Sequence, residues 1–259
     1  MTNPEDYIAA LINLHRGLDR QGPGDEAFSR RILSELPELP PGPRIADLGC
    51  GTGAGALLLA EWFHSHVLAV DMAQAFVEEL RIKAQQRGLD HLIMTLEADM
   101  GTLDWPEASI DLLWSEGAAY NLGFERALQL WRPLVAENGL AVISEMSWFT
   151  SNAPAPAKDF WKVAYPAMAG EEQNLEQAGH SGFSIVNSYR LPSQAWWDNY
   201  YNPLKLRIAS LRSTADHVMQ TVIHETETEM SLFEQYSESY GYTFYVLRAT
   251  PVSAAQDAF

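Results

Sequence analysis

The sequence predicts an α/β protein built on a mainly parallel sheet, and three observations lead to this prediction. Between residues 44 and 148, short apolar runs alternate with helical segments of about ten to fifteen residues. The first run ends in a glycine-rich turn that opens a helix. The second run ends in an acid, Asp71. Strands separated by helices of this length pair in parallel through right-handed crossovers.

Two helices are expected before this region. Residues 4–17 have the apolar spacing of a helix, and a second helix is expected from about Asp25. The segment 20–24 (RQGPG) separates them, and residues 37–43 (PELPPGP) form a stiff, proline-rich connector. We therefore expect an N-terminal helical lid over residues 1–40 and a second domain over residues 41–259.

The elements of the second domain follow in order. Apolar runs predict strands at residues 44–49, 66–72, 92–100, 109–116 and 139–148. Helical spacing predicts helices at residues 53–63, 73–88 and 125–135.

The last third of the chain has a different pattern. A loop is expected at residues 151–159, followed by a short helix over FWKVAYPAM. Strands are expected at residues 182–191 and 242–250. The residues between them predict long helices, so the last two strands enclose a helical insertion over about residues 192–240.

Composition narrows the class of partner. The 259-residue chain has 17 Lys and Arg against 34 Asp and Glu, a net charge of −17. Phosphate backbones and anionic membranes need a basic surface, so neither is an expected partner. The one cysteine, Cys50, the lack of a basic region before an apolar core at the N-terminus, and the lack of a long uncharged apolar stretch predict a cytoplasmic protein.

The glycine-rich turn carries the chemistry. Gly49, Gly51 and Gly53 let the backbone approach a ligand closely, and the helix that follows offers free N–H groups to an anion. Asp71, 22 residues after Gly49 (71 − 49), can accept hydrogen bonds from ribose hydroxyls. The spacing Gly49-x-Gly51-x-x-Ala54 also fits a dinucleotide site. The form DLGCGTG, with a later acid at Asp99, favours S-adenosylmethionine (SAM).

These residues give the chain a family resemblance. It resembles the class I SAM-dependent methyltransferases, and in particular the bacterial small-molecule group similar to ubiquinone/menaquinone-biosynthesis methyltransferases. The narrower resemblance rests on further segments, of which WSEGAAYNLGFERALQLWRPLV (114–135) is the longest. One departure is the turn Glu137-Asn138-Gly139, where the family usually has Lys-Pro-Gly-Gly; Asn-Gly can make the same turn.

The resemblance implies a Rossmann-like sheet of seven strands in the order 3-2-1-4-5-7-6, with strand 7 antiparallel. SAM then lies at the carboxyl ends of the strands. By position, Asp71 holds the ribose, Met72, Asp99 and Met100 surround the adenine, and Ser115 lies below the sulfonium end. Arg20 is expected at the cofactor carboxylate. The residues expected around the methionine part are Gly49, Cys50, Gly51, Thr52 and Gly53.

The acceptor is expected beyond the fourth and fifth strands. Glu116, Tyr120 and Glu145 are the candidate catalytic residues, although Glu116 could instead pair with an arginine such as Arg126 or Arg132. Most of the many aromatic side chains from Trp148 to Tyr201 are expected to pack, with two or three at the acceptor. The alternating acids Glu225, Glu227 and Glu229 are expected to face solvent.

The function these patterns predict is in-line methyl transfer from SAM to a small molecule, with S-adenosylhomocysteine as product and no metal. Two alternatives stay open: an NAD(P)-dependent oxidoreductase, and a SAM-binding protein without catalysis. The expected partner is a small molecule, with no nucleic acid and no membrane, and a homodimer is left open.

Overall fold

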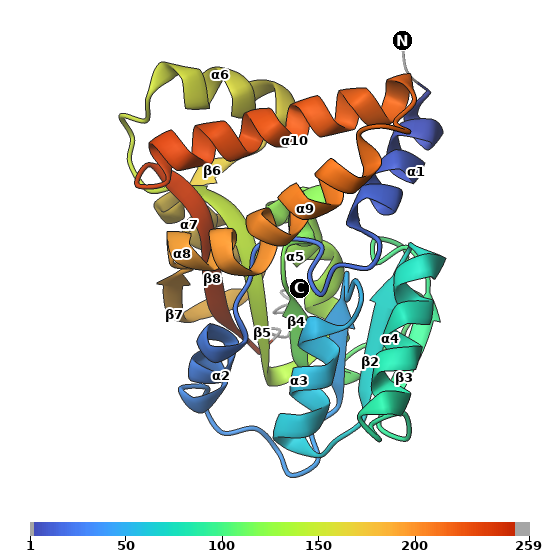
Figure 1. Cartoon of the computed structure of the whole chain (residues 1–259). Coiled ribbons are helices and arrows are strands. Elements are labelled where there is room, and N and C mark those ends of the chain that lie inside the picture. Colours follow the sequence, from blue (N-terminus) through green and yellow to red (C-terminus); the bar gives the residue numbers. More distant parts are fainter. Residues whose placement is uncertain (1–2, 252–259) are drawn as a thin grey trace.

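A central sheet organises residues 3–251, the part of the chain that the computed structural model describes (Figure 1). Its strand order is β3-β2-β1-β4-β5-β8-β7, and the two-residue β6 pairs with β5 off this path. β8 runs antiparallel to both β5 and β7, whereas the other pairs are parallel. The strands are β1 (Ile45–Leu48), β2 (Val67–Asp71), β3 (Ile93–Glu97), β4 (Ile110–Ser115), β5 (Val135–Trp148), β6 (Ala169–Gly170), β7 (Phe183–Arg190) and β8 (Tyr240–Ala249).

This topology confirms the predicted order 3-2-1-4-5-7-6. The expected sixth and seventh strands are β7 and β8, because β6 was not predicted and shifts the numbering by one. β6 has two residues, which is too short for an alternating pattern to be visible in the sequence.

Helices cover both faces of the sheet, which is why its central strands are almost continuously apolar. Alternate strand residues enter two separate cores. Ile45, Leu112 and Val142 belong to the core beneath α3 (Ala54–Phe63) and α4 (Gln74–Gln86). Ala46, Leu113 and Ile143 belong to the core beneath α5 (Phe124–Trp131) and α7 (Glu171–His180).

Most of the remaining helices belong to two segments, one before β1 and one between β7 and β8. The N-terminal pair is α1 (Pro4–His15) and α2 (Glu26–Ser34), and the Asp25 side chain caps α2 by accepting from the Phe28 N–H at 2.7 Å. Figure 1 shows α1, α9 and α10 together at one end of the sheet. The segment between β7 and β8 contains α8 (Ser193–Trp196), η3 (Trp197–Tyr201), α9 (Asn202–Leu211) and α10 (His217–Tyr236). The predicted helical insertion is therefore confirmed.

Three local boundaries differ from the expected ones. α6 (Ala155–Ala164) begins inside the segment expected to be a loop, because a proline is tolerated in the first turn of a helix. The helix expected over 125–135 ends at Trp131, and a 3-10 turn, η2 (Arg132–Leu134), follows it. The predicted Asn-Gly turn lies inside β5, where Asn138 has φ 61° and the register with β4 shifts.

Candidate active site at the carboxyl ends of the strands

The turn after β1 has the geometry that its glycines allow. Gly49, Gly51 and Gly53 have φ of 75°, 53° and 95°, in the left-handed region that other residues adopt at a cost. Space is also restricted. A Cβ on Gly51 would lie 2.4 Å from the Gln21 side-chain oxygen, and one on Gly53 would lie 2.1 Å from Leu80. α3 follows without a side-chain cap or an acid in its first turn, so its N-terminus suits an anion.

Asp71 fixes this turn at the end of β2. Its Oδ2 accepts from the Gly51 N–H and its Oδ1 from the Ala73 N–H, both at 2.8 Å. Burial raises the pKa of Asp71 against the lowering effect of these two bonds. Each carboxylate oxygen can accept more than one hydrogen bond, so capacity remains for ribose hydroxyls. Met72 follows with 65% of its surface exposed, as an apolar platform next to this acid.

The other expected cofactor residues already have partners within the fold. Asp99 is exposed, and its Oδ1 caps the next turn by accepting from the Gly101 N–H at 2.8 Å. Met100 is half-buried, and its carbonyl accepts from the Trp131 indole. The fully buried Ser115 hydroxyl donates to the Leu48 carbonyl at 2.8 Å and joins β4 to β1. Asp99 still has one carboxylate oxygen available for a ligand.

The segment between α1 and α2 lies against the glycine-rich turn. The Gln21 side-chain oxygen accepts from the Thr52 N–H at 2.8 Å. The Thr52 hydroxyl lies 3.2 Å from the Leu18 carbonyl and accepts from Lys83 at 3.0 Å. Gln21 was missed in the sequence, where its only signal was its position next to Arg20 in the segment 20–26.

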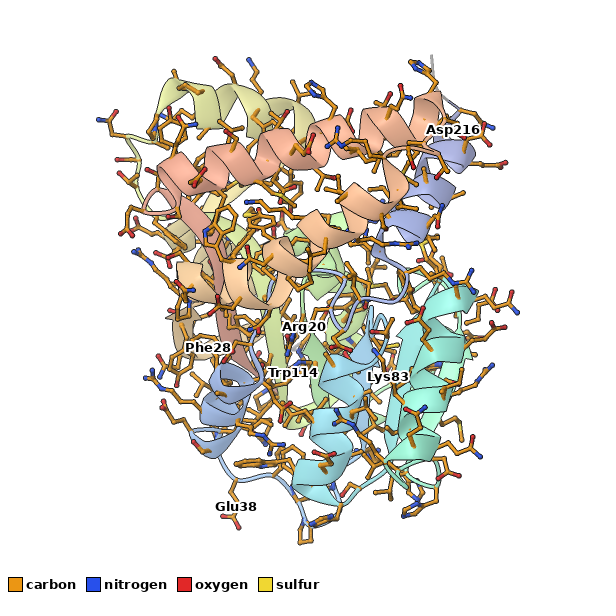
Figure 2. All side chains as sticks on the ribbon, in the orientation of Figure 1. Arg20, Phe28, Glu38, Lys83, Trp114 and Asp216 are labelled. Atoms are coloured by element: carbon orange, nitrogen blue, oxygen red, sulfur yellow. The ribbon has the colours of Figure 1, made fainter. Side chains whose placement is uncertain are left out.

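Arg20 and Glu116 form a largely buried ion pair. Arg20 donates to Glu116 Oε2 at 2.7 Å, and both side chains are about nine-tenths buried. Glu116 Oε1 accepts from the Ser29 hydroxyl at 3.0 Å and from the Trp114 indole at 2.9 Å. Figure 2 shows Arg20 and Trp114 close together at the centre of the molecule. Glu116 therefore pairs with an arginine, as the alternative role allowed, but the partner is Arg20 and not Arg126 or Arg132.

Two further buried groups are Asp47, which feels the charges of this pair, and Cys50, which feels the charge of Asp47. Asp47 is 2% exposed, its Oδ2 has no hydrogen-bond partner, and burial together with the Glu116 charge raises its pKa well above the usual range. Burial also raises the pKa of the Cys50 thiol, which keeps the sulfur protonated and unreactive. Cys50 thus contributes through its backbone, whose N–H donates to the Val70 carbonyl.

Glu145 lies on β5, beyond the level at which β4 ends. It is 1% exposed, and neither carboxylate oxygen has a hydrogen-bond partner in the described structure. Burial raises its pKa to about 8, against the lowering effect of the neighbouring Tyr165 hydroxyl. The Tyr165 ring meets the Tyr120 ring edge to face at 5.9 Å, and Tyr120 is 39% exposed. The structure therefore brings two of the three candidate catalytic residues, Tyr120 and Glu145, to one place.

The helical insertion adds residues that the sequence did not single out as site residues. Glu229 on α10 accepts from the Tyr201 hydroxyl at 2.7 Å, and burial raises its pKa, so the expectation that it faces solvent was wrong. His15 on α1 bonds the Tyr200 hydroxyl at 2.9 Å. The long sequence separation of these pairs explains why no local pattern indicated them. Most of the other aromatic side chains pack, as Trp196 does on Phe233 at 4.2 Å.

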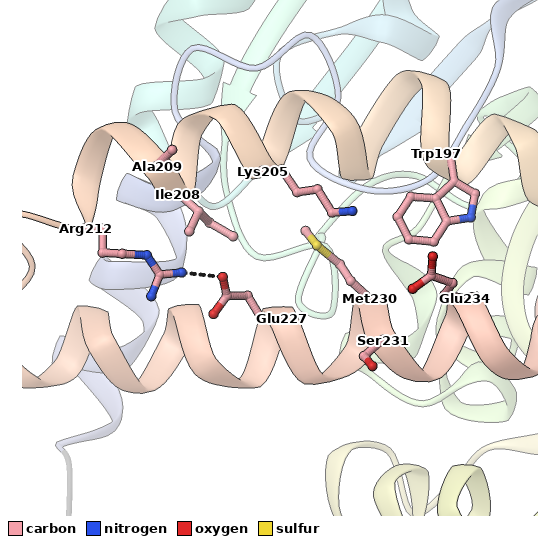
Figure 3. Close-up of a pocket in the computed structure, with 9 residues that line it drawn as sticks. All are labelled: Trp197, Lys205, Ile208, Ala209, Arg212, Glu227, Met230, Ser231 and Glu234. Carbon is pink, nitrogen blue, oxygen red and sulfur yellow. Dashed lines mark hydrogen bonds and ion pairs between the residues drawn. The ribbon is translucent and has the colours of Figure 1, made fainter.

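A hollow of about 350 Å³ lies between α9 and α10 (Figure 3). Its charged groups largely satisfy one another, since Arg212 pairs with Glu227 and Lys205 lies 4.6 Å above the Trp197 ring. It is separate from the glycine-rich turn, and none of the expected site residues lines it.

Comparison with known proteins agrees with this geometry. Residues 45–139 match the family described as "Methyltransferase domain". A SAM-dependent methyltransferase from Geobacter sulfurreducens, solved in complex with S-adenosyl-L-homocysteine, has the same fold, with a TM-score of 0.77 at 18% identity over 93% of this chain and 98% of that one.

Three curated relatives are similar in sequence. The 27-O-demethylrifamycin SV methyltransferase of Amycolatopsis mediterranei is 32% identical over 40% of this chain and 39% of that protein. The trans-aconitate 2-methyltransferase of Escherichia coli is 26% identical over 74% of this chain and 71% of that one. The sarcosine/dimethylglycine N-methyltransferase of Halorhodospira halochloris is 29% identical over 43% of each. The chain thus spans less than half of the first and third of these relatives.

The sheet order, the glycine-rich turn with its acid, and the matched domain define a protein of the SAM-binding α/β class. Within that class, residues 45–139 match the methyltransferase-domain family, and the whole chain is similar to class I SAM-dependent methyltransferases in fold and in sequence.

Proposed function

We propose that this protein transfers a methyl group from SAM to a small molecule. The observation that carries the proposal is the turn formed by Gly49, Gly51 and Gly53, held by Asp71 and followed by the exposed Met72. Bound SAM supplies a methyl group that its positive sulfur has already activated. The protein must then bind both partners, orient them and exclude water.

The residues around the turn fit SAM. Asp71 would accept the ribose hydroxyls, Met72 would cover one adenine face, and Asp99 would meet the adenine edge through its remaining oxygen. The uncapped N-terminus of α3 would face the carboxylate. Arg20 stays a proposed carboxylate ligand; its guanidinium is paired with Glu116 just after β4, and the next residue, Gln21, contacts the turn.

We infer different roles for the three candidate catalytic residues. Glu116 already accepts from Arg20, Ser29 and Trp114, so it acts as a positioning residue and not as a proton acceptor. Glu145 has no such partners, and together with Tyr120 it is placed to act on the acceptor. The relatives' names point to a rifamycin, an aconitate and an amine acceptor, so the family alone does not define this substrate.

The N-terminal helices and the helical insertion support closure over the site. The Tyr7 hydroxyl on α1 bonds Glu225 on α10, and Gln21 contacts the turn. We propose that residues 1–40 and about 192–240 form the lid of a methyltransferase domain over 41–259. A ligand on the turn must displace or share the Gln21 contact.

The net charge of the chain limits the partners that we propose. With a net charge of −17, we propose a small-molecule acceptor and no nucleic acid. No helix within residues 3–251 is long and apolar enough to cross a membrane. A cytoplasmic location stays a prediction that fractionation would check, and light scattering would decide between a monomer and a homodimer.

The test is titration calorimetry with S-adenosylhomocysteine and, separately, with NADH and NADPH. The proposal expects binding of the first and none of the others, followed by transfer of label from SAM in a metabolite screen. Nicotinamide binding without S-adenosylhomocysteine binding would favour the oxidoreductase instead. Cofactor binding without any transferable label would favour a SAM-binding protein without catalysis.

A further inference from the structure

Six side chains near the ends of β4 and β5 form what we call the acidic tyrosine cluster. They come from five parts of the chain that fold over the same edge of the sheet: the turn after β4, β5, the end of α6, the helical insertion and β8. The members are Tyr120, Glu145, Tyr165, Tyr200, Glu229 and Tyr242.

Several contacts place these residues together. The Tyr120 and Tyr165 rings lie 5.9 Å apart, and Tyr200 packs on Tyr201, which bonds Glu229. A Cβ on Gly117, just after β4, would lie 3.2 Å from the Tyr242 hydroxyl. The charges of Glu145 and Glu229 both raise the pKa of Tyr120, so Tyr120 lies near both carboxylates.

The unpartnered carboxylate of Glu145 indicates that a ligand binds there. Burying a carboxylate without a hydrogen bond is costly, and native structures rarely retain such a group without a functional reason. Here both oxygens of a side chain that is 1% exposed have no partner, and the neighbouring Tyr165 hydroxyl has none either. What is missing is a group that can donate several hydrogen bonds into a small, buried, acidic space.

The described residues supply no cation for these carboxylates. Arg20 is paired with Glu116, and among the residues that the structure describes Glu229 accepts only from Tyr201. On the same face of the sheet, Thr243 lies opposite Glu145 in the strand register, and it donates to Glu171, which Arg190 neutralises. Within residues 3–251, no lysine or arginine forms an ion pair with Glu145 or Glu229. The cluster therefore has two acids, electron-rich rings and no compensating charge.

We propose that the acidic tyrosine cluster binds the ammonium group of an amine acceptor, with Glu145 as its carboxylate partner. An ammonium has three N–H donors and no acceptor, which matches two unpartnered carboxylate oxygens and a tyrosine hydroxyl. Tyrosine faces add cation–π attraction, which is stronger away from water. This inference rests on the proposed function, because it identifies the acceptor of that same site.

The arrangement also gives the bound amine a place to leave a proton. An ammonium has no lone pair, so one N–H proton must leave before nitrogen can act as a nucleophile. Passing it to a Glu145 oxygen leaves a neutral amine and a protonated carboxyl group, with charge and protons balanced. Burial holds the pKa of Glu145 at about 8, which suits a proton acceptor near neutral pH. The titratable groups that face it are Tyr165 and Tyr120, with Glu171 beyond Thr243; Tyr242 pairs with Met146 in the strand register, and its hydroxyl feels the Glu145 charge from the other face of the sheet.

The test uses benzylamine, benzyl alcohol and benzoate, three probes of similar shape and different charge. Calorimetry with the full chain saturated in S-adenosylhomocysteine should show benzylamine binding at least ten-fold more tightly than benzyl alcohol, and no benzoate binding. Repeating the titration at pH 7 in two buffers of different ionisation enthalpy should show about one proton released per benzylamine, as the free Glu145 carboxyl gives up its proton.

Variants sharpen this test. Glu145→Gln should remove the preference for benzylamine and the proton release, whereas Glu137→Gln, at an exposed position near the other end of the same strand, should change neither. Proton counting on the unmodified protein keeps the proposal testable even if Glu145→Gln does not fold.

Equal binding of benzoate, no proton release, or an intact preference in Glu145→Gln would overturn the proposal. If S-adenosylhomocysteine binds and these results appear, only the amine proposal fails. If S-adenosylhomocysteine does not bind, the proposed function itself fails.

Discussion

The guanidinium of Arg20 lies 2.7 Å from the Glu116 carboxylate and joins the segment before α2 to the end of β4. Ser29 on α2 donates to the same carboxylate, so two parts of the N-terminal region converge on one acid. This pair links the N-terminal region to the end of β4, and the neighbouring Gln21 accepts from Thr52 in the turn expected to hold the cofactor. Glu116 therefore fixes the position of residues 20–29 relative to the end of β4.

Breaking this pair should weaken cofactor binding, because the segment that holds Arg20 would lose its fixed position as well as a charge. We expect Arg20→Met and Glu116→Gln each to reduce S-adenosylhomocysteine affinity, and the double variant to cost less than the sum, with a coupling of about 1–3 kcal/mol. A double-mutant cycle by calorimetry measures this coupling. Strictly additive effects would show that the ion pair has no part in binding.

Asp71 should contribute to affinity directly. Asp71→Ala removes the acceptor proposed for the ribose and frees the Gly51 N–H, so S-adenosylhomocysteine binding should weaken by about 1–3 kcal/mol. Asp90→Ala, at an exposed position, serves as the control and should leave affinity unchanged. An equal effect of the two substitutions would contradict the ribose assignment.

A comparison of Gly53 in the glycine-rich turn with Gly42 outside it separates the cost of backbone strain from the cost of steric crowding. Gly42 has φ +63° with nothing within 4 Å of an added Cβ, whereas Gly53 has φ +95° and an added Cβ would lie 2.1 Å from Leu80. Gly42→Ala should lower the free energy of unfolding by about 1–2 kcal/mol. Gly53→Ala should lower it further, because overpacking adds about 1–3 kcal/mol. Urea denaturation of both variants tests this order, and a smaller effect at Gly53 would refute it.

The raised pKa of Glu145 should make the free energy of unfolding depend on pH. Its pKa rises from 4.5 to about 8 on folding, so between these values the folded state binds more protons than the unfolded state. Its contribution to stability is therefore complete below pH 4.5, falls as pH rises to about 8, and is level above. Each pKa unit is worth about 1.4 kcal/mol, so the slope should be measurable by denaturation at several pH values. Glu145→Gln should flatten this part of the profile. A wild-type slope that survives in the variant would assign it to another group.

The sequence predicted the sheet well because its signals are local. Strand–helix alternation, the glycine spacing and Asp71 lie within short stretches, and the strand order followed from the family resemblance. The candidate site was only partly predictable for the opposite reason. Tyr201 and Glu229 are 28 residues apart, His15 and Tyr200 are 185 apart, and Arg20 and Glu116 are 96 apart.

The alternating acids show how a local pattern can mislead. Their spacing of two does not place Glu225, Glu227 and Glu229 on one helical stripe, so the sequence indicated a solvated surface. α10 instead turns Glu229 toward Tyr201, while Glu227 pairs with Arg212. Which carboxylate enters the interior depends on how α10 packs, and that follows from contacts with distant parts of the chain.

The most direct test of the central claim is calorimetry of the full chain with S-adenosylhomocysteine. We expect one site per chain with a Kd well below ~1 mM, the level that corresponds to about −4 kcal/mol. Wild-type protein should bind and Asp71→Ala should bind more weakly. No heat of binding at ~1 mM ligand, from protein that is folded by circular dichroism, would contradict the assignment of the turn as a SAM site.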